Sequence, residues 1–264
     1  MAVSYFLSDV HIKDNQDINY IKLNQFLEKD WLSHRGDIYL LGDIFDLWVS
    51  NHQIFVHSYK RLIHNLIQVK QKGFKVVYFE GNHDLHLNKF WHQELGFEVQ
   101  REIKTYSIEG LKFRLEHGDL INSKDLAYLR LRRFLRTPTM TFLAHTIPGL
   151  FWKILGQKWS HESRKNSRRF KENKTTEIIE MIRNYAENQD QDQKQNHDPD
   201  RDPFDVMITG HMHVKDTYEF QKNNETKISI NLGSWFEEPS ILKFERCVPG
   251  NSLKNFSWIK CESP

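Results

Sequence analysis

The chain has 264 residues, of which 39% are hydrophobic and 13% aromatic, and its formal net charge is +2. A chain of this length can bury a substantial core, so we expect one domain, residues 1–264, carrying an insertion, rather than two domains. The small net charge indicates no particular class of partner. Only Cys247 and Cys261 occur, which argues against a disulfide framework and favours a reducing compartment.

The chain begins with Met1-Ala2 and passes directly into a predicted strand, without a basic leader, an apolar segment or a cleavage site of small residues. We therefore expect a cytoplasmic protein. The longest nearly uncharged run, residues 137–152, is shorter than the roughly 18 residues that a membrane-spanning helix needs. No membrane-spanning segment is expected.

Predicted strands and helices alternate along the chain. Runs of apolar, β-preferring residues predict strands at residues 3–7, 38–41, 74–79, 111–115, 205–209, 226–232 and 241–244. Amphipathic spacing predicts helices over residues 17–34 and 55–72, each followed by a glycine. Residues 123–188 read as a mostly helical insertion, and residues 189–203 as a flexible polar loop. This order predicts a layered α/β fold.

Each of the first five predicted strands ends in a short polar cluster. The clusters are Ser8-Asp9-Val10-His11, Gly42-Asp43, Glu80-Gly81-Asn82-His83-Asp84, Glu116-His117-Gly118-Asp119 and Gly210-His211-Met212-His213. Because open α/β sheets bind ligands at the carboxyl ends of their strands, we expect these clusters to meet at one site. An unpaired carboxylate such as Asp43 would cost several kcal/mol in an apolar setting, so a metal or a cation should lie beside it.

The clustered side chains predict a metal centre. Carboxylate, amide and imidazole ligands without a thiolate suit Mn, Fe, Zn or Co better than a structural zinc. Seven ligands exceed the need of one tetrahedral ion, so two divalent ions are implied, with Asp43 as the candidate bridge. A single Asp-x-His or His-x-His pair is weak evidence, since a lone histidine is usually an ordinary core or surface residue. Five clusters at successive strand ends make chance a poor explanation.

In this order, the five clusters resemble the signature of the calcineurin-like metallophosphoesterases. The resemblance implies a four-layer αββα sandwich with the metal ions at one edge of two packed sheets. It also implies that a hydroxide shared by the ions attacks phosphorus. Carried over by position, the ligands of the first ion would be Asp9, His11, Asp43 and His213, and those of the second Asp43, Asn82, His117 and His211. Manganese is the expected metal, with Fe, Zn or Co as alternatives.

His83 has no place among these ligands. In many members of the family this histidine stands beside the phosphate and either stabilises the developing charge or protonates the leaving oxygen. We therefore predict His83 and Asp84 as catalytic residues, with Asp84 orienting the ring of His83. The alternative is that His83 only packs the loop.

The insertion carries a closer resemblance, to the UDP-2,3-diacylglucosamine pyrophosphohydrolase family. Its features are Asp125-x-x-Tyr128, the basic segment 129–136, the apolar segment 142–155 and the basic segment 163–169, together with Leu232-Gly233-Ser234-Trp235. The family's enzyme cleaves a nucleotide-linked diacylglucosamine into UMP and a lipid monophosphate, a cytoplasmic step in lipid A biosynthesis. The residues that the resemblance assigns to substrate binding are Asn82, His83, Asp125, Tyr128, Asn166 and Arg169.

This resemblance implies a lipid substrate and a peripheral contact with the cytoplasmic face of the inner membrane. Arg and Lys in the insertion suit a diphosphate and anionic head groups, and its apolar residues suit an acyl groove or the membrane interface. The chain differs from the best-known branch of the family at His83, where that branch has an arginine, and at Asp46, where it has a glutamate.

Three other interpretations stay open. The apolar residues of the insertion could simply form a helix-packing core, and its basic residues a solvated face. The enzyme could also act on another diphosphate or on a nucleotide phosphodiester. Finally, the protein could be a non-catalytic binding module on a phosphoesterase scaffold, although the complete ligand set argues against this and no nucleic-acid partner is expected.

Overall fold

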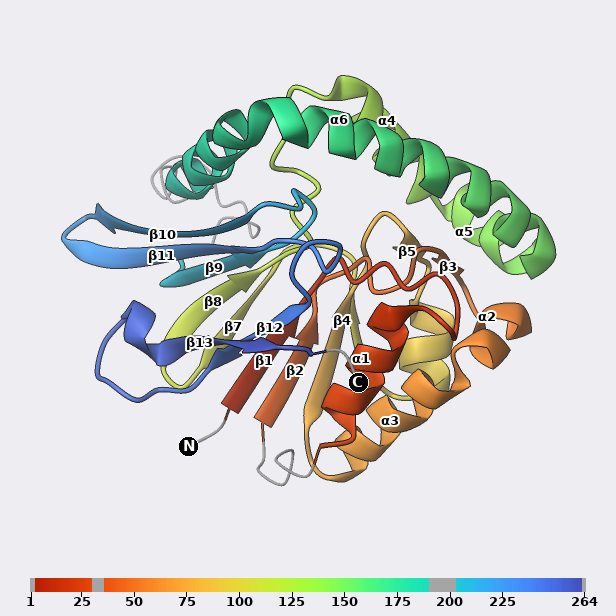
Figure 1. Cartoon of the computed structure of the whole chain (residues 1–264), viewed down its shortest axis with the longest axis horizontal. Coiled ribbons are helices and arrows are strands. Elements are labelled where there is room, and N and C mark those ends of the chain that lie inside the picture. The colour runs from red at the N-terminus through yellow and green to blue at the C-terminus, as the bar shows by residue number, and fades with distance from the viewer. Residues whose placement is uncertain (1–2, 30–35, 190–202, 263–264) are drawn as a thin grey trace.

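The core of the protein is a six-stranded sheet whose central strands are the predicted apolar runs. The computed structural model describes residues 3–29, 36–189 and 203–262, and for residues 157–173 it describes the backbone alone. The strands of this sheet, in spatial order, are β13 (Phe256–Lys260), β12 (Ser240–Phe244), β1 (Val3–Leu7), β2 (Gly36–Leu40), β4 (Lys75–Phe79) and β6 (Glu98–Gln100). Strands β1, β2, β4 and β6 are parallel, so their carboxyl ends lie at one edge (Figure 1).

A second sheet packs against the first. Its strands, in spatial order, are β10 (Lys215–Lys222), β11 (Glu225–Leu232), β9 (Val206–Thr209), β8 (Leu111–Leu115) and β7 (Lys104–Ile108). Between the sheets, the ring of Phe6 stacks on Tyr39 of its own sheet, with centroids 4.9 Å apart, and on Phe113 of the opposite sheet at 5.8 Å. Since β8 and β9 are parallel neighbours, their carboxyl ends also meet.

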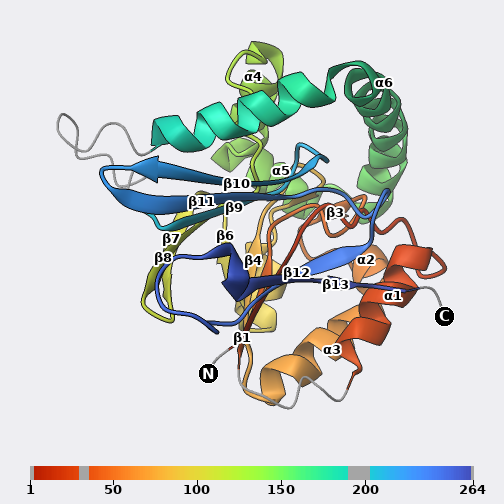
Figure 2. The ribbon, with the colours of Figure 1, turned by 60° about the vertical axis from the view of Figure 1, so that its left-hand side comes forward.

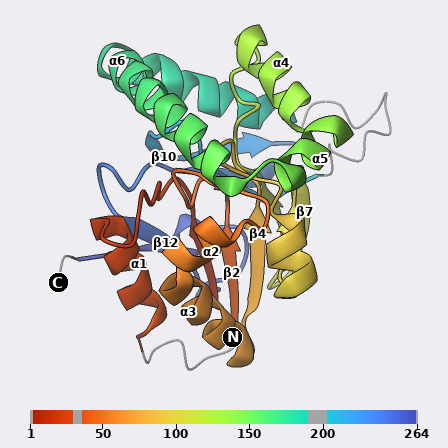
Figure 3. The same ribbon diagram turned by 90° about the vertical axis from the view of Figure 1, so that its right-hand side faces the viewer.

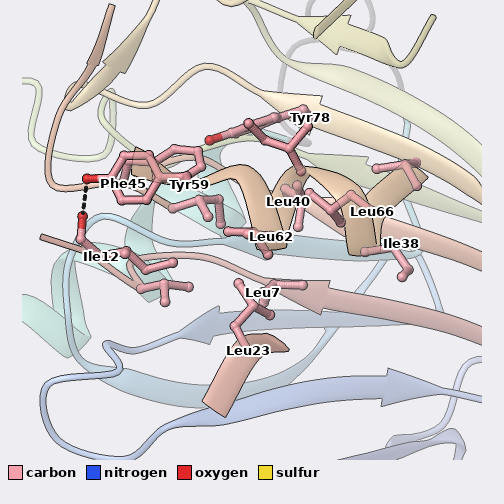
Figure 4. Close-up of a cluster of buried hydrophobic side chains, with 14 of the residues drawn as sticks. Leu7, Ile12, Leu23, Ile38, Leu40, Phe45, Tyr59, Leu62, Leu66 and Tyr78 are labelled. Carbon is pink, nitrogen blue, oxygen red and sulfur yellow. Dashed lines mark hydrogen bonds between the residues drawn. The ribbon is translucent and has the colours of Figure 1, made fainter. Parts of the chain in front are cut away.

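Helices cover the outer face of the first sheet. They are α1 (Ile18–Leu27), α2 (Gln53–Ser58) and α3 (Lys60–Gln71). Figure 4 shows Leu23 of α1 and Leu62 and Leu66 of α3 among the apolar side chains of this layer. The helix predicted over residues 17–34 is shorter, ending at Leu27 before residues 30–35, which lie outside the described part. The helix predicted over residues 55–72 is two helices, because Tyr59 has a non-helical backbone.

Three helices occupy the predicted insertion. They are α4 (Leu126–Leu135), α5 (Pro138–Thr146) and α6 (Gly149–Gln189), and α6 is interrupted at Lys174, where φ is −142°. Figures 2 and 3 show α5 and the first half of α6 above the ends of the strands. The predicted flexible loop falls almost entirely on residues 190–202, outside the described residues.

The last part of α6 belongs to the sandwich itself. Ile178 and Ile182 pack with Ile121 and Val214, while Ala186 packs with Met207 of the second sheet. Figure 1 shows this end of α6 lying over β10 and β11. This segment supplies the fourth layer, so the predicted αββα sandwich is confirmed. A short pairing of β3 (Trp48–Val49) with β5 (Asp84–Leu85) joins the loops above the first sheet. None of the described helices has both the length and the apolar composition of a membrane span.

The packing of α6 yields a first prediction. Replacing the fully buried Ile182 with alanine leaves a cavity under the fourth layer, so the free energy of unfolding should fall by about 2–5 kcal/mol. Urea denaturation measures the loss. Glu180→Ala, on an exposed position of the same helix, is the matched control and should change the value by about 0.5 kcal/mol or less. Equal effects of both variants would show that α6 does not form this layer.

Candidate active site

All seven predicted metal ligands lie together at the carboxyl ends of five parallel strands. Asp9 and His11 follow β1, Asp43 follows β2, and Asn82 follows β4. The second sheet contributes His117 after β8 and His211 and His213 after β9. Among the described residues, three groups have ligand atoms within 4.8 Å of one another and could hold metal ions: Asp9, His11 and His213; His11, Asp46 and His83; and Asp43, His117 and His211.

The first group surrounds one point between the two sheets. His213 Nε2 lies 3.2 Å from Asp9 Oδ1 and 3.1 Å from His11 Nε2. His11 Nε2 is also 3.8 Å from Asp43 Oδ2. Four potential ligand atoms from β1, β2 and β9 therefore converge.

The group of Asp43, His117 and His211, joined by Asn82, lies beside the group of Asp9, His11 and His213. His117 Nε2 lies 3.2 Å from Asn82 Oδ1, 3.2 Å from His211 Nδ1 and 3.6 Å from Asp43 Oδ2. The same oxygen of Asp43 thus faces both groups. This position would allow Asp43 to act as the predicted bridge between two ions.

The backbone is bent sharply at these residues. Asp9, His11, Asp43, His211 and His213 all have φ between 50° and 65°, a left-handed conformation that costs free energy in a residue other than glycine. The loops also approach each other closely. A Cβ atom on Gly81 would lie 2.1 Å from Asp43 Oδ1, so only glycine fits beside this carboxylate.

The electrostatics of the cluster suit a bound cation. Burial lowers the pKa of His11 to about 3 and that of His211 to about 4, so both rings are neutral, as metal ligands must be. Burial also disfavours the charged form of His117, but the carboxylates of Asp43, Asp9 and Asp119 raise its pKa to about 9. The negative field that keeps a proton on His117 would equally attract a metal ion, so the residues present fit the predicted metal centre.

His83 lies at the edge of the cluster. Its ring meets that of His11 edge to face, with centroids 4.9 Å apart, and its Nδ1 is 2.9 Å from the carbonyl oxygen of Asp46. A carbonyl oxygen can only accept, so Nδ1 carries the hydrogen and Nε2 is available to a ligand.

The prediction that Asp84 orients His83 is wrong. The buried carboxylate of Asp84 instead accepts hydrogen bonds from the backbone N–H groups of Asp43, Ile44 and Gly81, at 2.8–3.0 Å, and from the hydroxyl of Tyr78 at 2.6 Å. Asp84 therefore fixes the loops that carry the metal ligands, while the backbone of Asp46 orients His83.

A cavity of about 370 Å³ opens between the cluster and the insertion. Its polar end carries Asn82, His83, Asp119 and Tyr128. The apolar side chains that line the rest are Leu47, Val49, Leu85, Leu131, Leu135, Met140, Ala144, Trp152 and Leu155. Of the apolar segment 142–155, Ala144, Trp152 and Leu155 line this cavity, whereas Phe142, Leu150, Phe151 and Ile154 are exposed.

Helix α4 is tied to the cluster through Asp119. Its carboxylate lies 2.5 Å from Arg132 Nε and accepts a hydrogen bond from the hydroxyl of Tyr128 at 3.1 Å. The ring of Tyr128 lies 5.6 Å from that of His211. The sequence-based site omits Asp119, Arg132 and Arg136, which all line the cavity. A signal for Arg132 was present, because it lies one helical turn after Tyr128 on the same face.

Three further residues are predicted to bind substrate: Asp125, Asn166 and Arg169. Asp125 caps α4, since its Oδ1 accepts a hydrogen bond from the backbone N–H of Tyr128 at 2.9 Å, and it does not line the cavity. The prediction that Asp125 binds substrate is therefore not supported. The side chains of Asn166 and Arg169 lie outside the described part of the chain.

Comparison with known proteins identifies a consistent set of relatives. No protein-family model matches the chain. The UDP-2,3-diacylglucosamine hydrolase of Vibrio atlanticus (strain LGP32) is 29% identical over 248 residues, covering 91% of this chain and 93% of the relative. The protein of the same name from Aliivibrio fischeri (strain MJ11) is 26% identical, covering 95% and 98%. A solved structure described as a novel archaeal phosphodiesterase covers 98% of this chain and 99% of its own, at 14% identity and a TM-score of 0.43.

The two curated relatives carry the name of the family that the motifs resemble. The two packed sheets and the clustered aspartate and histidine side chains have the architecture that the resemblance implies. The chain is thus similar over nearly its whole length to UDP-2,3-diacylglucosamine hydrolases, and the predicted class of metal-dependent phosphoester hydrolase is confirmed.

Proposed function

We propose that this protein hydrolyses the diphosphate of UDP-2,3-diacylglucosamine, giving UMP and 2,3-diacylglucosamine 1-phosphate. One observation carries the proposal: a cluster of Asp, Asn and His ligands opens directly into a largely apolar cavity formed with the insertion. A diphosphate needs the first feature and an acyl chain needs the second. The names of the relatives supply the identity of the substrate.

Two divalent ions, with manganese expected, are assigned to the cluster. We assign Asp9, His11, His213 and Asp43 to one ion and Asp43, Asn82, His117 and His211 to the other. When bound, such ions polarise phosphoryl oxygens and make water a nucleophile near neutral pH.

His83 is proposed to act on the phosphate from the cavity side. Its Nδ1 donates to the carbonyl of Asp46, so its Nε2 can donate a hydrogen bond to the phosphate when the ring is protonated. From there it can stabilise the developing charge or give a proton to the leaving oxygen of the lipid monophosphate. Asp84 is assigned a positioning role through the loops.

The insertion is proposed to hold the lipid half of the substrate. Arg132 and Arg136 line the cavity beside the cluster, where their charges suit a phosphate or a sugar hydroxyl. Among the insertion residues whose side chains the structure describes, the large apolar ones that are exposed are Leu126, Leu131, Phe134, Phe142, Leu150, Phe151 and Ile154. They support a peripheral contact with the cytoplasmic membrane surface from which a lipid substrate would enter.

The direct test is hydrolysis of UDP-2,3-diacylglucosamine with added Mn²⁺ and, in parallel, with a chelator. We expect UMP and the lipid monophosphate to form in equal amounts with metal, and neither to form with chelator. Chromatography of both products measures the result. If simple phosphodiesters are cleaved and the lipid substrate is not, the enzyme acts on another phosphoester; if nothing is cleaved, the proposal of a catalytic site fails.

Asp43→Asn tests the bridging ligand. The substitution removes the charge that faces both groups of ligands, so we expect the bound metal to fall from two ions to one or none, and turnover to fall at least about a thousandfold. Inductively coupled plasma mass spectrometry measures the metal content. Asp14→Asn, which changes an exposed aspartate, is the control. A variant with two ions and normal turnover would reject the bridge.

His83→Ala separates catalysis from metal binding. Because His83 is not an assigned ligand, both ions should remain while kcat falls by about 10²–10⁴-fold. Metal analysis and steady-state kinetics on the same preparation check this. Loss of metal together with rate would instead place His83 among the ligands, beside His11 and Asp46.

A further inference from the structure

An exposed aromatic ring stands beside the metal-ligand cluster, outside the lipid cavity. Phe236 stacks on His11, with centroids 5.2 Å apart and planes inclined by 15°, and its centroid is 6.2 Å from that of His213. Phe236 is nevertheless 37% exposed. One face of the ring is covered by His11, so the exposed area belongs to the rest of the ring.

The loop that carries Phe236 is anchored to the cluster. The backbone N–H of Trp235 donates to the carbonyl oxygen of Asp9 at 3.2 Å, and the side chain of Trp235 is buried. The backbone N–H of Phe236 donates to Ser234 Oγ at 3.3 Å. The ring is therefore held in place by the same strand end that supplies two predicted ligands, as a preorganised binding surface requires.

Phe236 lies beside the ligand cluster but does not line the cavity. His83 and Phe236 both contact His11, but only His83 lines the apolar cavity. A diphosphate lying on the cluster with its lipid half in the cavity therefore directs its other half away from the cavity. Phe236 contacts His11 without lining the cavity, so its ring offers an aromatic surface to that other half.

A positive charge accompanies the ring. Lys13 Nζ lies 5.8 Å from the centroid of Phe236. The side chain of Lys13 is exposed, so an arriving planar group can displace it from the ring, and its ammonium can then meet a phosphate. An aromatic face beside a mobile cation is a combination that binds nucleotides, because every base has a face that stacks.

We propose that Phe236 is a stacking surface for the nucleobase of the substrate, and that Lys13 supports it. This subsite rests on the proposed function, since a nucleoside diphosphate substrate supplies the base. In this proposal the two halves of the substrate bind to different parts of the protein: the insertion holds the lipid, and the loop that carries Phe236 holds the nucleoside. The alternative is that Phe236 only packs against His11.

Isothermal titration calorimetry of the manganese-loaded protein with UMP and with ribose 5-phosphate separates these roles. The two ligands share the phosphate and the ribose and differ in the base. We expect the wild-type protein to bind UMP roughly tenfold more tightly. Phe236→Leu keeps apolar packing on His11 but removes the flat ring, so it should bind UMP no better than ribose 5-phosphate. Phe236→Trp should restore the preference.

The control is Tyr218→Leu. Tyr218 lies on β10, where its ring contacts the guanidinium of Arg183, and its loss should leave both affinities unchanged. Equal weakening of both ligands in Phe236→Leu, or a loss of bound metal, would assign Phe236 a packing role and overturn the proposal. An unchanged preference for UMP in Phe236→Leu, or no preference in the wild type, would also overturn it. The proposed function fails separately, if the wild-type protein binds UMP through its base but does not cleave UDP-2,3-diacylglucosamine.

Discussion

The carboxylate of Asp84 is the contact on which the site depends. It accepts hydrogen bonds from the backbone N–H groups of Asp43 and Gly81, so it joins the loop after β2 to the loop after β4. The joined loops then bring the N–H groups of Asn82 and His83 to Asp43 Oδ1, both at 2.9 Å. With Oδ1 held in this way, Oδ2 faces both groups of imidazoles. The hydrogen bonds that hold the buried carboxyl group of Asp84 thus determine the direction in which the carboxylate of Asp43 points.

Aromatic packing under these loops keeps the arrangement stable. Trp91 packs on Tyr78, whose hydroxyl donates a hydrogen bond to Asp84. It also packs on Trp48, which contacts Phe45 in the loop after β2. Each large ring buries much apolar area and permits few alternative positions. The free energy stored in left-handed backbone at Asp9, His11 and Asp43 is offset by this packing, which is why strained loops can persist at the site.

The sequence predicts the central strands and the ligand cluster because each of these strands is rich in apolar, β-preferring residues and is followed by a polar cluster. It does not reveal β6, β7, β10 and β13, whose partly exposed faces carry charged or polar residues such as Lys104 and Glu219. The true role of Asp84 could not be predicted, since two of its backbone donors, Asp43 and Ile44, lie about 40 residues away in the chain. Arg132 reaches the site only because the fold places α4 beside Asp119.

Helix α4 of the insertion contacts the ligand cluster through Asp119. Asp119 lies in the loop after β8 that also carries His117. Its carboxylate pairs with Arg132 and accepts a hydrogen bond from Tyr128, both in the insertion. Arg132 is therefore already paired before a phosphate arrives, and an anionic substrate must compete with Asp119 for its charge. Since Asp119 also adds to the negative field at His117, any shift of Arg132 toward substrate alters the field at the metal ligands. Under the proposed function, a substrate that draws Arg132 away from Asp119 would therefore change the field around His117, in addition to the contact that its diphosphate makes with the cluster.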